Sequence, residues 1–227
     1  MAYEIGPGDA LVIVDPQNDF CPGGALAVAG GDEIMAPIVG LARRFRAAGG
    51  LIVVTQDWHP EDHKSFASNH EGGKPFATAQ MPYGEQVLWP DHCVQAAPGA
   101  DFHPDLEGAV EQAHLIVRKG YNPEVDSYSA FFENDKATAT GLGGWLKEKG
   151  VRRCFFVGLA YDFCVGYSAL DAARRLGIDA VVLKDLTRAI AMPTGEGTTV
   201  DSIEASFRSA GVEVADSRDV APERAVA

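Results

Sequence analysis

Short apolar runs rich in branched residues alternate with longer amphipathic stretches along most of this chain. The runs are continuous rather than interrupted by polar residues, which is typical of strands covered on both faces of a sheet. We expect strands at residues 10–14, 51–55, 114–117, 154–157, 180–183 and 212–214, and helices at residues 33–48, 141–149, 162–176 and 200–210. Glycines follow these helices, as C-terminal caps do, at Gly49, Gly150, Gly177 and Gly211. The alternation predicts an α/β fold in three α/β/α layers, with a mainly parallel central sheet of about six strands.

The segment from residue 57 to residue 113 departs from this rhythm. It holds several prolines, shows little periodicity, and contains five of the six histidines. A loop of this length in a compact domain usually serves a function, so we expect residues 57–113 to bind metal and substrate. The length of 227 residues suits one domain that spans residues 1–227. The residues after Ser217 are expected to form a loose tail.

Composition excludes more partners than it identifies. The formal net charge is −13, which argues against nucleic acid or an anionic membrane surface, because both favour clustered lysine and arginine. No apolar run is long enough to span a membrane, and the first residues lack the basic region and cleavage site of a signal peptide. The four cysteines are irregularly spaced without a CxxC pair, which favours a reducing compartment over a disulfide framework. We therefore expect a cytoplasmic protein, and the sequence leaves a homo-oligomer open.

Reactive side chains follow four of the expected strands. Asp15 follows the first strand, Asp57 and His59 the second, Lys119 the third and Cys164 the fourth. In an open parallel sheet, ligands bind beyond the carboxyl ends of the strands. Each residue alone has an ordinary explanation: a turn cap, a pair of solvated loop residues, a surface lysine, or a buried and inert thiol. Their convergence on one edge of the sheet favours a catalytic site.

The position of Cys164 suits a nucleophile. It lies in the first turn of an expected helix that Asp162 could cap. Free N–H groups and the helix dipole there lower a thiol pKa, and a nearby lysine would lower it further. The same N–H groups can hold an oxyanion, while a neighbouring carboxylate takes the thiol proton and later protonates the leaving group. Asp15, Lys119 and Cys164 would therefore suffice for attack on an amide without a catalytic histidine.

A metal site is indicated by Asp57 and His59, which can present one oxygen and one nitrogen to the same ion. His92 would add a third ligand, with water in the remaining positions; the alternative is that all three are solvated loop residues. Cys93 is a competing ligand, but it would place one soft thiolate among hard partners. This donor set suits zinc, which we favour, and also ferrous iron or manganese. The other histidines of the loop are expected at the surface: His63, His70 and His103.

Five segments of the chain form a specific combination of motifs. They are VIVDPQNDF (12–20), TQDWHPEDHKSFA (55–67), LWPDHCVQ (88–95), RKGYNPEVDSYSAF (118–131) and VGLAYDFCV (157–165). Through DPQNDF, DWHP, WPDHC, KG and a late cysteine, the chain resembles the nicotinamidase/pyrazinamidase branch of the isochorismatase-like cysteine hydrolases. The segments run through most of the chain in the family's order.

The resemblance implies roles for the catalytic residues. Asp15, Lys119 and Cys164 match the family's catalytic triad. Ala160 and Cys164 match the positions whose backbone N–H groups form the oxyanion hole. The family also carries a cis peptide before that alanine, which would be Leu159–Ala160 in this chain.

The resemblance also implies the metal and substrate contacts. Asp57, His59 and His92 match the family's metal ligands, and Phe20 and Trp89 match the aromatic residues that flank the substrate ring. Some family members use further ligands between the first pair and the distal histidine. These do not align securely with this sequence.

The activity implied by the resemblance is metal-dependent hydrolysis of nicotinamide to nicotinate and ammonia in NAD salvage, with pyrazinamide as a further substrate. The nearest alternative is a related enzyme for another small amide, such as maleamate or a ureido compound, because one fold serves several substrates. An isochorismatase activity fits less well, since vinyl-ether hydrolysis offers no amide to attack and leaves the metal ligands without a purpose. A non-catalytic binding protein on this fold would be expected to lack one of Asp15, Lys119 and Cys164, and all three are present.

Overall fold

The centre of the molecule is a six-stranded sheet with the order β11-β8-β7-β2-β3-β6. The computed structural model describes residues 3–222. Every neighbouring pair in the sheet is parallel, which confirms the sheet predicted from the apolar runs. Its strands are β2 (Asp9–Val14), β3 (Leu51–Asp57), β6 (Leu115–Lys119), β7 (Arg153–Leu159), β8 (Asp179–Arg188) and β11 (Glu213–Ala215).

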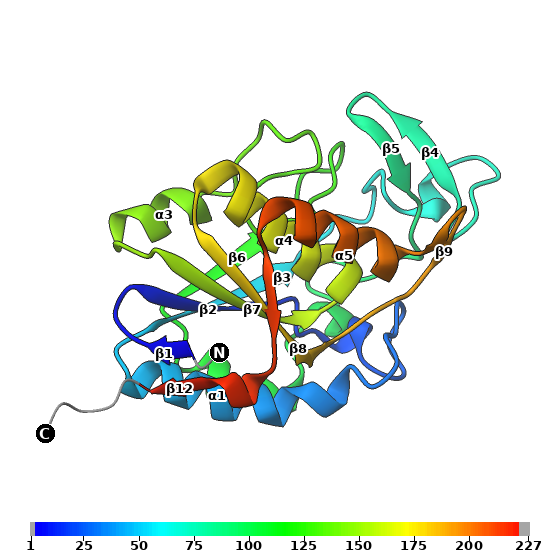
Figure 1. Ribbon diagram of the computed structural model, residues 1–227. Coiled ribbons are helices and arrows are strands. Elements are labelled where there is room, and N and C mark those ends of the chain that lie inside the picture. Colours follow the sequence, from blue (N-terminus) through cyan, green and yellow to red (C-terminus); the bar gives the residue numbers. More distant parts are fainter. Residues whose placement is uncertain (1–2, 223–227) are drawn as a thin grey trace, which may run out of the picture.

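Helices cover both faces of the sheet, as Figure 1 shows. Side chains of a strand point alternately to its two faces, so Leu11 and Ile13 of β2 join one apolar cluster, whereas Val12 and Val14 join the other. The first cluster includes α1, and the second includes α3, α4 and α5. This arrangement confirms the three α/β/α layers. The bounds are α1 (Met35–Ala47), α3 (Leu142–Glu148), α4 (Gly166–Asp171) and α5 (Thr199–Ala210).

The expected helices are confirmed, with differences at two of them. A 3-10 turn, Asp32–Ile34, precedes α1. The helix expected at residues 162–176 is α4 flanked by two π-helical segments, Tyr161–Val165 and Ala172–Leu176. Gly177 and Gly211 end their helices with left-handed backbone, at φ 64° and 73°, where the absence of a Cβ removes the strain.

Residues 57–113 form short elements instead of a regular layer. Their main feature is the hairpin of β4 (Thr78–Met81) and β5 (Gly84–Val87), which projects beside the carboxyl ends of the central strands (Figure 1). The short helix α2 (Glu107–Val110) ends the region. The region also holds the 3-10 turns Ala67–Asn69, Pro98–Ala100 and Pro104–Leu106.

Two further short features lie outside this region. One is the 3-10 turn Asn18–Phe20, and the other is the antiparallel pair of β9 (Pro193–Thr194) and β10 (Gly197–Thr198).

The predicted loose tail is wrong for the residues up to 222. A 3-10 turn, Ser217–Asp219, leads into β12 (Val220–Pro222), which pairs in parallel with β1 (Tyr3–Ile5). Backbone hydrogen bonding and the burial of Val220 hold this segment in place. The last part of the predicted tail, residues 223–227, lies outside the described residues. Within residues 3–222, no helix combines the length and apolarity needed to cross a membrane.

Candidate active site

The carboxyl ends of four adjacent strands bring the expected reactive residues together. Asp15 follows β2, and Cys164 lies in the π-helical segment after β7. Asp57 and Lys119 end β3 and β6, where they are register partners. Because β7, β2, β3 and β6 are successive neighbours, these side chains meet at one edge. Their exposed fractions are 0% for Asp15, 3% for Asp57, 1% for Lys119 and 7% for Cys164.

The ammonium of Lys119 joins this cluster. Its Nζ lies 2.8 Å from Asp15 Oδ2 and 2.5 Å from Asp57 Oδ1. It also donates to the carbonyl of Ser127 at 2.8 Å and faces Cys164 Sγ at 3.4 Å. Burial alone would lower the pKa of Lys119, but Asp15 and Asp57 raise it well above its usual value. The lysine is therefore a permanent cation between an acid, a thiol and a second carboxylate.

Asp15 is held in an unusual backbone conformation, with φ 45°. Its N–H donates to Thr55 Oγ1 at 3.1 Å, and that hydroxyl donates back to Asp15 Oδ1 at 2.6 Å. Burial and the charge of Asp57 raise the pKa of Asp15 to about 6, against the opposing effect of Lys119. Such a pKa suits a group that accepts and returns protons near neutral pH.

The surroundings of Cys164 differ from those expected. Burial raises the pKa of its thiol well above the usual value, although Lys119 opposes this effect, so the resting group is a thiol. Asp162 does not cap the helix, and the N-cap position belongs to Ala160. The carboxylate of Asp162 instead accepts from the N–H groups of Ile190 and Ala191, at 3.0 and 2.8 Å. It thereby ties the start of the helix to the loop after β8.

The expected metal ligands also meet at this edge. One donor atom each of Asp57, His59 and His92 lies within 4.8 Å of the others. The Nδ1 atoms of His59 and His92 lie 2.8 Å from the carbonyls of Gly120 and Pro90. A carbonyl can only accept, so each ring carries a proton on Nδ1, which leaves Nε2 as the nitrogen available to a metal ion. This is the usual orientation of metal-binding histidines.

The expectation of a surface position is wrong for His63. Its side chain is 0% exposed, its ring centroid lies 4.4 Å from that of His59, and its Nε2 has no hydrogen-bond partner within residues 3–222. Burial, together with His59, lowers its pKa to about 4. Periodicity could not reveal this, because His63 lies in an irregular turn. His70 and His103 are half-buried and belong to none of the ligand groups within the described chain.

Cys93 does not replace His92 in this cluster. It is fully buried, its N–H donates to Asp19 Oδ2 at 2.7 Å, and burial raises the pKa of its thiol well above the usual value. Among the described residues, it belongs to no group of potential metal ligands.

A narrow cavity opens over these groups. The expected aromatic residues Phe20 and Trp89 line it, together with Ala160 and Cys164. The peptide before Ala160, Leu159–Ala160, is cis, as the resemblance implied. The cavity also has lining residues that the sequence analysis did not single out: Leu26, Asp126, Tyr128, Phe163 and Ile190.

Two residues that the sequence did not indicate fix the ligand loop. Gln17 accepts from the N–H of Asp57 at 2.7 Å and donates to its carbonyl at 2.8 Å. Gly120 has φ 65°, and a Cβ at that position would lie 2.4 Å from Cε1 of His59. Both residues fall inside the matching segments, but their roles depend on contacts between distant strands.

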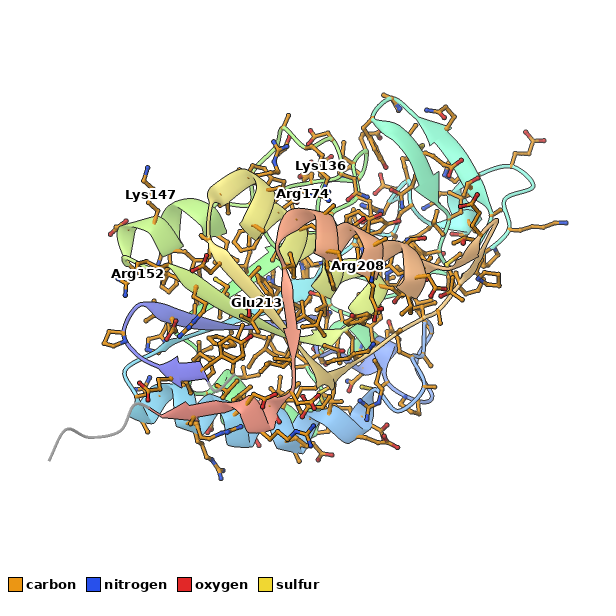
Figure 2. All side chains as sticks on the ribbon, viewed as in Figure 1. Lys136, Lys147, Arg152, Arg174, Arg208 and Glu213 are labelled. Carbon is orange, nitrogen blue, oxygen red and sulfur yellow. The ribbon has the colours of Figure 1, made fainter. Side chains whose placement is uncertain are left out.

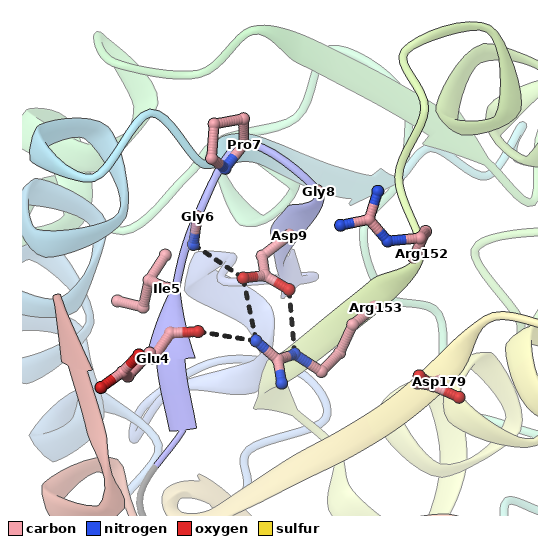
Figure 3. A pocket seen from close by; sticks show the side chains of 9 residues that line it. All are labelled: Glu4, Ile5, Gly6, Pro7, Gly8, Asp9, Arg152, Arg153 and Asp179. Atoms are coloured by element: carbon pink, nitrogen blue, oxygen red, sulfur yellow. Dashed lines mark hydrogen bonds and ion pairs between the residues drawn. The ribbon is translucent and has the colours of Figure 1, made fainter. Parts of the chain in front are cut away.

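A larger groove of about 400 Å³ lies at the opposite, amino-terminal edge of the sheet. Figure 3 shows its lining, in which Arg153 makes two hydrogen bonds of 2.9 Å to Asp9. Lys147 and Arg152 project at this end, away from the β4–β5 hairpin (Figure 2). The groove gathers no nucleophile and no group of metal ligands among the described residues.

Known proteins match this chain over most of its length. The family model described as the isochorismatase domain matches residues 9–219. The nicotinamidase of Acinetobacter baylyi is 52% identical over 183 residues, which cover 81% of this chain and 82% of that protein. The nicotinamidase of Escherichia coli is 43% identical over 184 residues, which cover 81% of this chain and 84% of that protein.

Solved structures agree with the sequence matches. The Acinetobacter baumanii nicotinamidase/pyrazinamidase superposes with a TM-score of 0.87 at 45% identity, covering 94% of this chain and 98% of that one. An L. infantum protein in complex with nicotinate superposes with a TM-score of 0.81 at 36% identity, and the match covers 98% of this chain and 100% of that one. A Pyrococcus horikoshii pyrazinamidase in complex with zinc superposes with a TM-score of 0.72 at 35% identity, and the match covers 92% of this chain and 99% of that one. The match to the isochorismatase domain, residues 9–219, includes the strands and loops that carry the candidate site.

Proposed function

This chain belongs to the isochorismatase family, and we propose that its carboxyl-edge site hydrolyses nicotinamide through Cys164. The activity is that of an amidohydrolase, which converts nicotinamide to nicotinate and ammonia as the similar nicotinamidases do. The observation that carries the assignment of residues is the buried contact of Lys119 with Asp15, Asp57 and Cys164. One cation thereby joins a proton acceptor, a nucleophile and a candidate metal ligand.

A divalent metal ion belongs to this site. The donor set fits, because one donor atom each of Asp57, His59 and His92 lies within 4.8 Å of the others and both imidazoles use Nδ1 for a backbone carbonyl. We propose zinc as the ion, with iron or manganese as alternatives that the same donors accept. When bound, the ion would hold the ring nitrogen of nicotinamide and so fix the ring in the cavity. His63, whose Nε2 is unpartnered among the described residues, is a candidate for a further ligand.

The aromatic lining would orient the substrate. Phe20 and Trp89 would hold the pyridine ring between them, and stacking geometry would place the amide carbon over Cys164. Trp89 is itself fixed, because its Nε1 donates to the hydroxyl of Tyr128 at 3.2 Å and its ring packs on that of Phe163 at 4.9 Å. A ring already held in position lowers the entropic cost of bringing the amide carbon to the thiol.

Asp15 would act as the proton carrier of the first step. Its carboxylate takes the thiol proton as Cys164 Sγ attacks the amide carbon, and the N–H groups of Ala160 and Cys164 stabilise the oxyanion. Asp15 then protonates the leaving nitrogen, the C–N bond breaks, and ammonia departs from a thioester. The permanent charge of Lys119 stabilises the transient thiolate and favours the ionised form of Asp15.

Hydrolysis of the thioester reuses the same groups. Asp15, again ionised, takes a proton from water as the water oxygen attacks the thioester carbon. The oxyanion forms again at the same N–H groups, the C–S bond breaks, and Asp15 returns its proton to the sulfur of Cys164. The product acid loses its remaining proton to solvent and leaves as nicotinate. No histidine is needed as a base, which leaves the three imidazoles of the site for the ion.

An ammonia-release assay over a panel of amides tests this assignment. We expect release from nicotinamide and pyrazinamide to exceed release from maleamate and ureido amides, because only the first two offer a ring nitrogen to the ion. Cys164→Ala should fold, bind metal and release no ammonia. Near wild-type activity in that variant would refute the mechanism, and preference for a non-aromatic amide would refute the substrate.

We also propose a cytoplasmic location. All four cysteines are buried and free, which fits a reducing compartment. Measurement of the free thiols in protein taken from the native cells checks this, and a disulfide would contradict it.

A further inference from the structure

Asp126 is a buried carboxylate without a lysine or arginine partner in the described part of the chain. Asp126 is 3% exposed. No lysine or arginine within residues 3–222 lies within ion-pair distance of its carboxylate. The ammonium of Lys119 already pairs with Asp15 and Asp57. A buried charge is costly unless another charge or a metal ion balances it. Asp126 therefore requires an explanation beyond packing.

The carboxylate faces the imidazoles of the candidate metal centre. One donor atom each of Asp126, His59 and His63 lies within 4.8 Å of the others. The Nε2 atom of His63 is the buried nitrogen without a partner. His59 also belongs to the group with Asp57 and His92. Asp126 thus shares His59 with the expected ligands, and it reaches this histidine from the loop between β6 and α3.

Local contacts fix the orientation of Asp126. Its Oδ1 accepts from the N–H of Ser127 at 2.7 Å, and its Oδ2 accepts from Gln86 Nε2 at 2.9 Å. Gln86 lies on β5 of the projecting hairpin. Each carboxylate oxygen accepts one hydrogen bond and has capacity for another, so the group is held in place without being saturated.

The net charge of the buried cluster also favours a bound divalent cation. Among residues 3–222, Lys119 is the one lysine or arginine that pairs with Asp15 or Asp57, and none pairs with Asp126, so these four groups carry two net negative charges when all are ionised. One divalent cation makes this cluster neutral. Without Asp126, the same cation would leave a net positive charge in a buried site.

We propose that Asp126 is the second carboxylate of the metal centre, a positioning residue that sets the affinity for the ion. This inference rests on the metal-dependent hydrolysis proposed above. Its chemistry is that of a hard oxygen donor beside imidazoles, which suits divalent zinc, iron or manganese. The alternative is a purely structural role, in which Asp126 only fastens the hairpin through Gln86.

Zinc affinity of the metal-free protein, measured by competition with a chromogenic chelator, tests the proposal. We expect Asp126→Asn to bind zinc about 10–100-fold more weakly than the wild type. The unfolding temperature of metal-free Asp126→Asn should be no lower than that of the metal-free wild type, because the substitution removes a repelling charge. The matched control is Glu133→Gln, which neutralises another buried carboxylate of the same loop, bonded to Asn122. It should bind zinc within about threefold of the wild type.

A second variant separates the two roles of Asp126. Gln86→Ala cuts the tie to the hairpin and leaves the charge, so its zinc affinity should stay well above that of Asp126→Asn. In the cobalt-substituted protein, the visible absorption bands should shift in Asp126→Asn and not in Glu133→Gln. Zinc affinity of Asp126→Asn within threefold of the wild type would overturn the proposal, as would an equal loss in Glu133→Gln. Both readouts omit turnover, so a wild type that binds zinc but releases no ammonia would refute the proposed function alone.

Discussion

Lys119 Nζ lies 2.5 Å from Asp57 Oδ1, so the lysine of the expected triad is also the ion-pair partner of an expected metal ligand. The contact arises because the two residues are register partners at the ends of β6 and β3. The expected catalytic and metal-binding groups therefore share the carboxylate of Asp57. A substitution in either group should therefore change the properties of the other.

Lys119→Met tests this sharing. Activity should fall at least about a thousandfold, because the thiolate and Asp15 lose their cation. Zinc affinity should not fall and is expected to rise, because an ammonium that repels the ion has been removed. The metal-free variant should unfold at a lower temperature, since two buried carboxylates lose their partner. Chelator competition and thermal unfolding measure these effects, and a loss of zinc affinity would contradict the shared carboxylate. Lys184→Met, which breaks an exposed pair with Glu204, should change little.

Gly120→Ala should weaken metal binding without touching a ligand. The new methyl group would meet the imidazole of His59 at 2.4 Å and displace it. The matched control is Gly150→Ala, because Gly150 has a similar φ of 72° but open space around the added Cβ. Both variants carry the backbone strain of a left-handed alanine, and only the first should lose metal by elemental analysis. Equal metal contents would show that the contact of Gly120 with His59 is unimportant.

His92→Ala and Cys93→Ser separate two neighbouring candidate ligands. His92 belongs to the group of expected ligands, whereas Cys93 lies outside it among the described residues. His92→Ala should lose most of its metal and activity, while Cys93→Ser should keep both nearly intact. Metal content of the purified variants provides the readout. The reverse result would reassign the ligand and leave the role of Cys164 untouched.

The acid limb of the pH profile should report Asp15. Its pKa is raised to about 6 by burial and by Asp57, and only the ionised form can take the thiol proton. The value of kcat/KM should therefore be level above this pH and fall about tenfold per unit below it. Bound metal should be measured at each pH, because ligand protonation also releases the ion. A flat profile down to pH 4.5 with metal retained would exclude Asp15 as the base.

The fold was predictable because its signals are local. The apolar runs of β2, β3 and β7 mark strands covered on both faces, and glycines such as Gly211 mark helix ends. The tail was not predictable, because the order of β12 depends on its pairing with β1 at the other end of the sequence. A loose tail and a distant edge strand look alike in a short polar sequence.

The candidate site was predictable only as far as strand ends and a family resemblance reach. Both indicate Asp15, Lys119 and Cys164, because each lies at or beyond the carboxyl end of a strand in a parallel sheet. The burial of His63 and the approach of Asp126 depend on how irregular loops fold over that edge. The thiol pKa of Cys164 was expected to be low, but helix-end electrostatics is outweighed by desolvation that no local pattern reveals.

The parallel pairing of β1 with β12 also has a mechanical consequence. Force applied to the two ends of the chain would load this pair along its strands, so its hydrogen bonds would bear the load together instead of opening one by one. Arg44 of α1 reinforces the pair by donating to the carbonyl of Val220 at 2.7 Å. Single-molecule pulling should therefore show a distinct first rupture that is weaker in Arg44→Ala, and the reactive edge of the sheet should bear no load until that rupture.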